Sequence, residues 1–521
     1  MRTPAARYVR AADLLSAGLL LLALWLAIVG ISHRVIFNRV FEPPSASLVF
    51  YVAVSVLIVR HVLWPKPTAW SRFTAARDAA MARPAMAAAV RAFLATRPAV
   101  FLVAFFAVLT IGLTAKPGFV LSREPLHNLP ARFDAGWYGE IALDGYSWDH
   151  TFQLQRNIAF FPALPMLMRP VGVVFGMNDS TAARERRMLR ALWAGTVLSL
   201  VAFLWALYYV ARLASDLVGP EYADGAALLL SAYPFAFFYN VPYTEALFLL
   251  GAAGAAWHFL RGQWIASSCF GLLVGLTRPN GCFLSIPLGI LALQQSVQRR
   301  RGLKTAPYLL WTGSRPSKAS GRPEPAEGRM PDPGSRIPPF DEAQGGPEAL
   351  EGPDPGVVPR LVTAAMPGIG MLIFTLYLYR LTGGVWFAWA RSHEAWGRTY
   401  RGLGPLVDGL AWLWNQPFLQ VVGSLPFNAL NTFGLVFAVA LTYPVFRRLG
   451  LAWGVFVLVN IVPPLLAGGV LSMGRLSATL FPLFLALAAI LPRRTVPAWV
   501  AGFAVAQGLC ATLFFTWREL F

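Results

Sequence analysis

Acidic residues are scarce in this sequence, and charged residues of either sign are few. Its 521 residues include 25 Asp and Glu and 44 Lys and Arg, and charged residues make up 13% of the chain. Because a soluble globular domain carries about 25% charged residues, this composition excludes an ordinary soluble protein.

Cysteine is nearly absent as well. The three cysteines, Cys269, Cys282 and Cys510, all fall within apolar runs. They form neither a disulfide framework nor a metal-ligand spacing, and we expect them to be small core residues.

Long apolar segments are what the sequence has in abundance. Hydrophobic residues account for 56% of the chain, and the mean hydropathy is +0.54. Apolar runs of roughly 17–25 residues cross about 30 Å of hydrocarbon, so we predict an all-α polytopic membrane protein with about thirteen (11–13) transmembrane helices. The expected spans are residues 14–31, 45–63, 98–115, 188–214, 223–240, 244–261, 264–278, 281–297, 359–381, 427–446, 450–468, 477–492 and 496–516.

The net charge of +19 fits membrane topology better than nucleic-acid binding. No run of Lys and Arg lies on a polar domain that could present it to a nucleic acid. With every span counted, the basic segments fall on the side of the N-terminus, which the positive-inside rule assigns to the cytoplasm. The Ala-, Arg- and Pro-rich composition is typical of a GC-rich bacterium, so we expect a multi-pass protein of its cytoplasmic (inner) membrane. The basic segments are residues 64–97, 299–301, 447–448 and 493–494.

Composition divides the chain into four parts. Residues 1–97 hold the first transmembrane helices and a basic cytoplasmic segment, and residues 98–300 form a core with an outer loop over 116–187. Residues 313–358 are rich in Pro, Gly, Glu and Ser with almost no apolar periodicity, which predicts a disordered cytoplasmic linker. Residues 359–521 hold the C-terminal transmembrane helices.

The outer loop contains an unusual group of acids within ARFDAGWYGEIALDGY, residues 131–146. Asp134, Glu140 and Asp144 alternate there with aromatic and aliphatic residues, which predicts a short helix in the membrane interface. One interpretation makes Asp134 a general base that takes a proton from an attacking hydroxyl. The other makes Asp134 only a helix N-cap, with Glu140 and Asp144 pointing to water.

Transfer from a lipid-carried donor would also need cations to stabilise a departing phosphate. The candidates on the outer face are Arg132, Arg278, Arg398 and Arg475, with His393, although each could instead be an interfacial anchor. Two further polar groups lie in outer turns. Glu245 in YTEALF and Asn280 in TRPNG are candidates for binding, although a Thr–Glu helix start and a Pro–Gly turn explain them equally well.

The loop resembles the first outer loop of the PIG-V-like mannosyltransferases, whose pattern is R-W-D-[SAG]-x-[WHF]-[YF]-x-x-I-A-x-x-G-Y. Further pieces follow in the family's order, and the resemblance covers roughly residues 98–300 and 360–492. Phe133 stands where the family usually has Trp, and residues 313–358 lie outside the pattern. The further pieces are FFPALPMLMRP (160–170), YPFAFFYNVPYTEALFLL (233–250), LTRPNG (276–281) and SMGRLSATLFPLFLALA (472–488).

The resemblance implies a membrane glycosyltransferase of the GT-C class. Such an enzyme transfers mannose from a polyprenyl-phosphate donor to an acceptor hydroxyl on the non-cytoplasmic face, with inversion at the anomeric carbon. The acceptor would be a lipid or a lipid-linked glycan, although nothing in the sequence points to a glycosylphosphatidylinositol precursor. The resemblance assigns Asp134 as base and matches Arg132, Trp137, Tyr138, Tyr146, Glu245, Arg278 and Asn280 to its motifs, and we expect these residues other than Asp134 and Arg278 at the substrates. Together with the outer-face cations, this leads us to expect Arg278, Arg475, Arg398 and His393 at the donor phosphate.

We expect no cofactor and no metal, although the three loop acids could in principle bind a hard cation. Two alternatives stay open. A transporter or lipid flippase would be polytopic too, but no convincing internal repeat is present and the acids cluster at the outer surface. A non-catalytic scaffold with the same fold is the other, since a fold does not guarantee chemistry.

Overall fold

The computed structural model describes residues 4–300, except 30–33, 37–38 and 42–44, and residues 356–520, except 401, 418, 421–425 and 519. The predicted linker over 313–358 falls almost entirely outside the described residues. The described chain is helical apart from one short hairpin, formed by β1 (Arg34–Ile36) and β2 (Arg39–Phe41).

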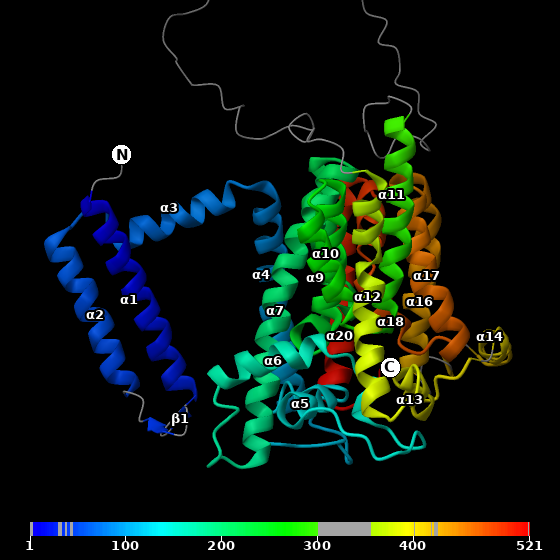
Figure 1. The fold of residues 1–521 in the computed structure, drawn as a ribbon, viewed down its shortest axis with the longest axis horizontal. Coiled ribbons are helices and arrows are strands. Elements are labelled where there is room, and N and C mark those ends of the chain that lie inside the picture. The colour runs from blue at the N-terminus through cyan, green and yellow to red at the C-terminus, as the bar shows by residue number, and fades with distance from the viewer. Residues whose placement is uncertain are drawn as a thin grey trace, which may run out of the picture.

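The first two long helices, α1 (Pro4–Val29) and α2 (Ala46–Leu63), pack against each other beside the main bundle (Figure 1). Ser45 begins α2, and its Oγ accepts a hydrogen bond from the Leu48 N–H at 3.2 Å. A buried Arg60 on α2 pairs with Asp13 on α1 at 2.7 Å. Helix α3 (Ala69–Met81) then leads from this pair to the bundle.

Each expected span overlaps one or two helices, but not every helix is long. By length and composition, seven helices in the described part of the chain could cross a membrane, or eight if α18 and α19, bent by 71°, count as one span. The number of crossings therefore stays a prediction. The bundle contains α4 (Pro84–Thr110), α7 (Arg184–Leu217), α8 (Ala223–Ala232), α9 (Glu245–Leu260), α10 (Trp264–Gly275), α11 (Ser285–Arg300), α12 (Val357–Leu381), α16 (Pro426–Leu449), α17 (Leu451–Gly468), α18 (Met473–Thr479), α19 (Phe481–Ile490) and α20 (Val496–Phe515).

Helix α8 gives way to a 3₁₀ segment, η3 (Pro234–Asn240), where the hydropathy pattern predicted one continuous span. The break frees backbone carbonyls that must find donors, because unpaired polar groups are costly away from water. Arg97 on α4 supplies them, donating to the Ser231 and Ala236 carbonyls at 2.6 Å each and to Asn240 Oδ1 at 2.6 Å. Arg97 was expected in the basic cytoplasmic segment; it is instead 1% exposed inside the bundle.

Glycine lets α18 approach its neighbours closely. A Cβ on Gly474 would lie 2.2 Å from the Phe235 ring, and a Cβ on Gly434 of α16 would lie 2.7 Å from the Gly474 Cα. Asn431 on α16 accepts a hydrogen bond from the Gly474 N–H at 3.0 Å. The backbone next to Arg475 is therefore fixed by contact on two sides.

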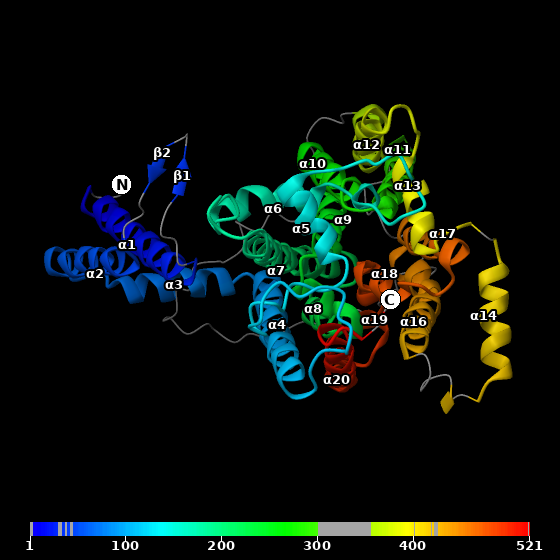
Figure 2. The ribbon, with the colours of Figure 1, turned by 90° about the horizontal axis from the view of Figure 1, so that it is seen from below.

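The helices that frame the outer loop gather at one end of the bundle, near the C-terminus (Figures 1 and 2). A helix is confirmed within residues 131–146: α5 (Ala135–Asp144) packs on α7 and on α6 (Ala163–Val174). Its position in a membrane interface stays a prediction. The other elements at this end are η1 (Asn157–Ala159), η4 (Pro279–Leu284), α13 (Ala388–Ser392) and η6 (His393–Trp396). Helix α14 (Gly404–Asn415) lies to the side of the bundle.

Candidate active site

A cavity of about 1050 Å³ lies at this end of the bundle. Its wall combines α5, the start of α9, η4, the α13–η6 segment and α17–α18, which come from both sides of the undescribed residues 301–355. Asp134 is in this wall, as are seven other candidate site residues named from the sequence. Those seven are Arg278, Arg475, Arg398, His393, Trp137, Tyr138 and Asn280.

Asp134 stands at the N-terminus of α5, and its carboxylate does not cap the helix. Its Oδ2 accepts a hydrogen bond from Arg475 Nη1 at 2.8 Å. Its backbone N–H donates to Tyr243 Oη at 3.0 Å, and that hydroxyl donates to the Arg132 carbonyl at 3.2 Å. The interpretation of Asp134 as only an N-cap is therefore wrong: the side chain is held toward an arginine 341 residues away in the chain.

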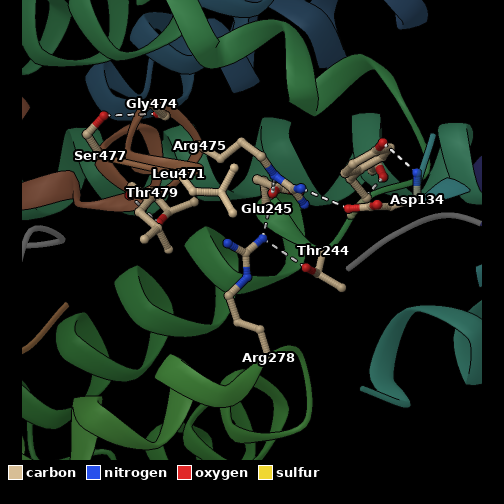
Figure 3. Close-up of polar contacts among 12 residues, drawn as sticks. Asp134, Thr244, Glu245, Arg278, Leu471, Gly474, Arg475, Ser477 and Thr479 are labelled. Carbon is tan, nitrogen blue, oxygen red and sulfur yellow. Dashed lines mark hydrogen bonds and ion pairs between the residues drawn. The ribbon is translucent and has the colours of Figure 1, made fainter. Parts of the chain in front are cut away.

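Glu245 is the centre of a network of two carboxylates and two guanidinium groups (Figure 3). Its Oε1 lies 2.9 Å from Arg475 Nε and 2.8 Å from Arg278 Nη2. Arg278 Nη2 also donates to Thr244 Oγ1 at 2.8 Å, so Thr244 is engaged by the arginine and makes no side-chain cap on α9. Glu245 is fully buried, which shows that it is more than first-turn helix chemistry.

The network is electrically balanced. Asp134 and Glu245 carry two negative charges, and Arg278 and Arg475 carry two positive charges. Arg475 alone contacts both acids, with Nη1 on Asp134 and Nε on Glu245. Its guanidinium also lies 4.9 Å from the centre of the Tyr243 ring, so its plane is fixed on several sides. Because the Arg475 guanidinium is held in one orientation, its hydrogen bond also holds the Asp134 carboxylate in one orientation.

Arg398 is the cation of the cavity that this network does not compensate. Its Nη2 donates to the Leu471 carbonyl at 3.4 Å, and no carboxylate lies within ion-pair distance of it in the described ranges. Burial, and then the charge of Arg475, lower the pKa of Arg398 to about 10, which leaves it protonated at neutral pH. It is therefore available to an anionic ligand.

His393 does not have the charge that a phosphate-binding role requires. Burial lowers its pKa to about 4, so the ring is neutral at physiological pH. Its Nδ1 lies 2.7 Å from the Trp389 carbonyl, and the neutral ring must donate its single N–H there. The remaining nitrogen, Nε2, then carries a lone pair and accepts hydrogen bonds. The predicted role of His393 as a phosphate-binding cation is thus not supported.

The aromatic residues named from the motif form part of the wall. Trp137 stacks on Phe160, with ring centres 5.8 Å apart and planes 18° apart, and meets the Trp396 ring edge-on at 5.9 Å. Tyr138 is buried beside them, and burial raises its phenolic pKa, so it stays a neutral hydroxyl. Asn280 donates from Nδ2 to Asn460 Oδ1 at 2.8 Å, which ties η4 to α17.

Three residues predicted to bind substrates do not line the cavity, namely Glu245, which is fully buried within the charge network, and Arg132 and Tyr146. Arg132 is fully buried, and it donates from Nε to the Phe515 carbonyl at 2.8 Å and from Nη1 to the Asn128 carbonyl at 2.6 Å. Tyr146 donates to the Phe160 carbonyl at 2.7 Å. Both residues hold the loop in place, and we assign them structural roles instead of substrate contacts.

Comparison with known families now bears on these residues. Residues 106–297 match the family model described as Mannosyltransferase (PIG-V). This stretch includes Asp134, Glu245 and Arg278, whereas Arg475 lies beyond it. The resemblance seen in the sequence is confirmed over residues 106–297. The apolar helices of the described chain support an integral, multi-pass membrane protein.

Two solved structures resemble part of this chain in fold. One is an oligosaccharyltransferase of Archaeoglobus fulgidus in complex with zinc and sulfate, at 12% identity and a TM-score of 0.35. The other is the oligosaccharyltransferase AglB of the same organism with an inhibitory peptide and dolichol-phosphate, at 12% identity and a TM-score of 0.34. Each alignment covers 81% of this chain, and the chain spans about half the length of these proteins, 53% and 55% respectively. No curated protein matches the chain.

The sequence interpretation missed one acid inside the PIG-V-matched loop. Glu140 was expected to point to water, but it lines the cavity and accepts a hydrogen bond from Asn157 Nδ2 at 3.2 Å. A signal was present: Glu140 follows Trp137 by three residues, and such positions share a helix face. Asp144 does lie at the surface, where it pairs with Arg184 at 2.5 Å.

The four-residue network also bears on metal binding. In the parts of the chain that the structure describes, no three His, Cys, Asp or Glu side chains come together as a metal site would require. Between Asp134 and Glu245 the positive charge is supplied by Arg475.

Proposed function

We propose that this protein transfers a mannosyl group from a polyprenyl-phosphate donor to an acceptor hydroxyl, with inversion at the anomeric carbon. The observation that carries the proposal is a carboxylate, Asp134, in the wall of a cavity that also holds the uncompensated cation Arg398. A base and a phosphate-binding cation are the two groups that such a transfer needs. The PIG-V match supports the choice of mannose.

In the reaction, Asp134 accepts the proton of the acceptor hydroxyl as the oxygen attacks the anomeric carbon. The bond between that carbon and the phosphate oxygen breaks on the opposite face, and its electron pair leaves with the polyprenyl phosphate. The new glycosidic bond therefore has inverted configuration. A positioned base contributes about 10²–10⁴-fold to such a rate.

The charges in the cavity fit this sequence of events. A sugar phosphodiester carries one negative charge, and the departing phosphate monoester gains a second. Arg278 and Arg475 are each held by carboxylates, so Arg398 supplies the attraction that grows as charge develops. Arg475 keeps the Asp134 carboxylate in place.

Helix directions support a site on the non-cytoplasmic face. The Thr114 N–H donates to the Thr516 carbonyl at 3.1 Å, which joins the chain just beyond the ends of α4 and α20 next to the outer loop. The basic residues Arg83, Arg493 and Arg494 precede the starts of these helices and so belong to the opposite end of the bundle. By the positive-inside rule, that opposite end faces the cytoplasm.

The transporter alternative gains nothing from these observations. Its expected feature is ionisable groups near the bilayer midplane, whereas Asp134 stands at the start of α5, which lies at one end of the bundle (Figure 1). The apolar part of the cavity wall, which includes Phe119, Pro463 and Trp517, suits a lipid-borne substrate.

Donor use tests the proposal. The purified full chain in lipid nanodiscs would be given membrane lipid extract as the source of acceptor. The donor would be radiolabelled mannose carried either by polyprenyl phosphate or by a nucleoside diphosphate. We expect labelled product, with inverted linkage, from the polyprenyl-phosphate donor alone. Turnover of the nucleotide sugar, or no turnover of either donor, contradicts the proposal.

A further inference from the structure

The cavity has a second polar region, which lies further along α5 than the charge network. We use the name Glu140 lobe for Glu140, Gln155 and Arg184, which line the same cavity as Asp134. Glu140 follows Asp134 by six residues on α5, which corresponds to about 9 Å along the helix axis. The proposed transfer reaction uses none of these three side chains.

The Glu140 carboxylate has one oxygen fixed by a hydrogen bond and the other available to a ligand. Asn157 is 1% exposed; its Nδ2 donates to Glu140 Oε1 at 3.2 Å and to the Gly145 carbonyl at 3.2 Å. These contacts fix one oxygen of the carboxylate. The described part of the chain provides no hydrogen-bond donor to the other oxygen, Oε2, which leaves it able to accept one from a ligand.

The charges of the lobe select the kind of ligand. Arg184, the cation of the lobe, is already paired with Asp144 outside the cavity wall at 2.5 Å, so within the lobe Glu140 carries the charge that this pair does not compensate. Burial raises the pKa of Glu140, and the nearby Arg184 opposes that rise. A phosphate or carboxylate is disfavoured beside Glu140, whereas a hydroxyl group can donate to it. This is the reverse of the Arg398 side of the cavity, where an anion is favoured.

We propose that the Glu140 lobe binds the acceptor, and that the acceptor is a polyhydroxylated molecule whose non-reacting hydroxyl donates to Glu140 while its reacting hydroxyl lies at Asp134. This assignment rests on the proposed function, because it needs Asp134 to be the base. Trp137 lies between the two acids on α5, and its stack with Phe160 forms an aromatic wall along that path. A simple alcohol would fill the position at Asp134 and leave Glu140 without a ligand.

The test separates acceptor use from donor chemistry. The full chain in nanodiscs receives polyprenyl-phosphate mannose with a labelled sugar, and octyl α-mannoside or membrane lipid extract as acceptor. Two rates are measured, namely transfer to acceptor and hydrolysis of the donor by water. The variants are Glu140→Ala and Glu140→Gln, and Glu185→Gln is the matched control because Glu185 is exposed at the start of α7 and outside the cavity wall.

We expect Glu140→Ala to raise the acceptor KM by about 10-fold or more, as the loss of one hydrogen bond to a charged group predicts. Glu140→Gln keeps an acceptor oxygen and should show a smaller rise. Glu140→Gln keeps an acceptor for the buried Asn157 amide, so its melting temperature should match the wild type, whereas Glu140→Ala removes that acceptor and should melt at a slightly lower temperature. The ratio of transfer to donor hydrolysis should fall in both variants, and Glu185→Gln should match the wild type in every measurement. Linkage analysis should place the transferred mannose on a polyhydroxylated headgroup.

The outcomes against the proposal are distinct. An acceptor KM that Glu140→Ala leaves unchanged overturns the role of Glu140, even if transfer itself is active. A product in which mannose is linked to a simple long-chain alcohol overturns the acceptor class, as does hydrolysis without transfer in both acceptor arms. If the wild type neither transfers nor hydrolyses the donor, the proposed function itself is refuted.

Discussion

Replacing Glu245 by Gln tests the charge network most severely. The substitution keeps the size of the side chain but removes the negative charge that two guanidinium groups share, at 2.8 Å from Arg278 and 2.9 Å from Arg475. Asp134 would then face two arginines alone, and the site would carry one uncompensated positive charge. Breaking a buried ion pair on one side costs about 3–5 kcal/mol.

The expected magnitude follows from burial. Glu245 is fully buried, and the side chains of Arg278 and Arg475 are 11% and 12% exposed, so solvent screens this network weakly. A loss of about 3–5 kcal/mol in the free energy of unfolding should lower the melting temperature by several degrees. Because Arg475 loses the contact at Nε, its hold on Asp134 should loosen, and transfer should fall more than donor binding.

The assay is thermal unfolding of the full chain at fixed detergent, followed by tryptophan fluorescence, together with transfer kinetics. The matched comparison is the double variant Glu245→Gln, Arg278→Gln, in which one negative and one positive side chain are removed together. If the network is a balanced unit, the double variant should be more stable than Glu245→Gln alone. Equal or additive losses in the double variant would refute the reasoning, because additivity means that the two side chains do not interact.

Three further predictions can be checked on the same preparation. Arg398→Met should raise the donor KM by about 10-fold or more, since it removes a charged contact to phosphate, and an unchanged KM would exclude Arg398 from that role. His393→Gln should leave the pH profile of donor KM between about pH 6 and 8 unaltered, because burial puts the pKa of His393 near 4 and the ring is already neutral there; a lost inflection would show otherwise. Gly474→Ala should destabilise the protein by about 1–3 kcal/mol, measured as a lower melting temperature, since the new Cβ would lie 2.2 Å from Phe235; a wild-type melting temperature would contradict the close packing.

The order of the motifs predicted most residues of the site but not which of them pair with one another. Asp134, Glu245, Arg278 and Arg475 were all named from the sequence, and the structure brings them into one network. Their pairing could not be predicted, since Asp134 and Arg475 are 341 residues apart and an outward-facing arginine is equally compatible with an interfacial anchor. A motif also does not separate side chains that meet substrate from those that hold the loop. Arg132 belongs to the second kind.

Hydropathy predicted where helices occur better than how they run. A window average treats residues 223–240 as one span, whereas the chain leaves α8 for η3 near Pro234. The donor that makes this break tolerable, Arg97, comes from a helix that begins 14 residues before the expected span, at Pro84 instead of near Pro98. Local sequence does not reveal that an arginine is buried when its partners are backbone carbonyls from a distant segment. The positive charge of Arg97 therefore led to the prediction that it belongs to a cytoplasmic segment.

The most direct test of the central claim is Asp134→Asn, assayed for transfer from radiolabelled polyprenyl-phosphate mannose. Asp144→Asn is the matched control, because Asp144 is on the same helix but its side chain is half exposed and pairs with Arg184 outside the network. We predict that Asp134→Asn inserts in the membrane and stays folded at the assay temperature, with a melting temperature lowered less than that of Glu245→Gln because the Asp134 side chain is 21% exposed and Glu245 is fully buried. Asp134→Asn should lose at least about 100-fold in transfer rate, while Asp144→Asn retains it. Near-normal transfer by a correctly inserted Asp134→Asn protein would contradict the account.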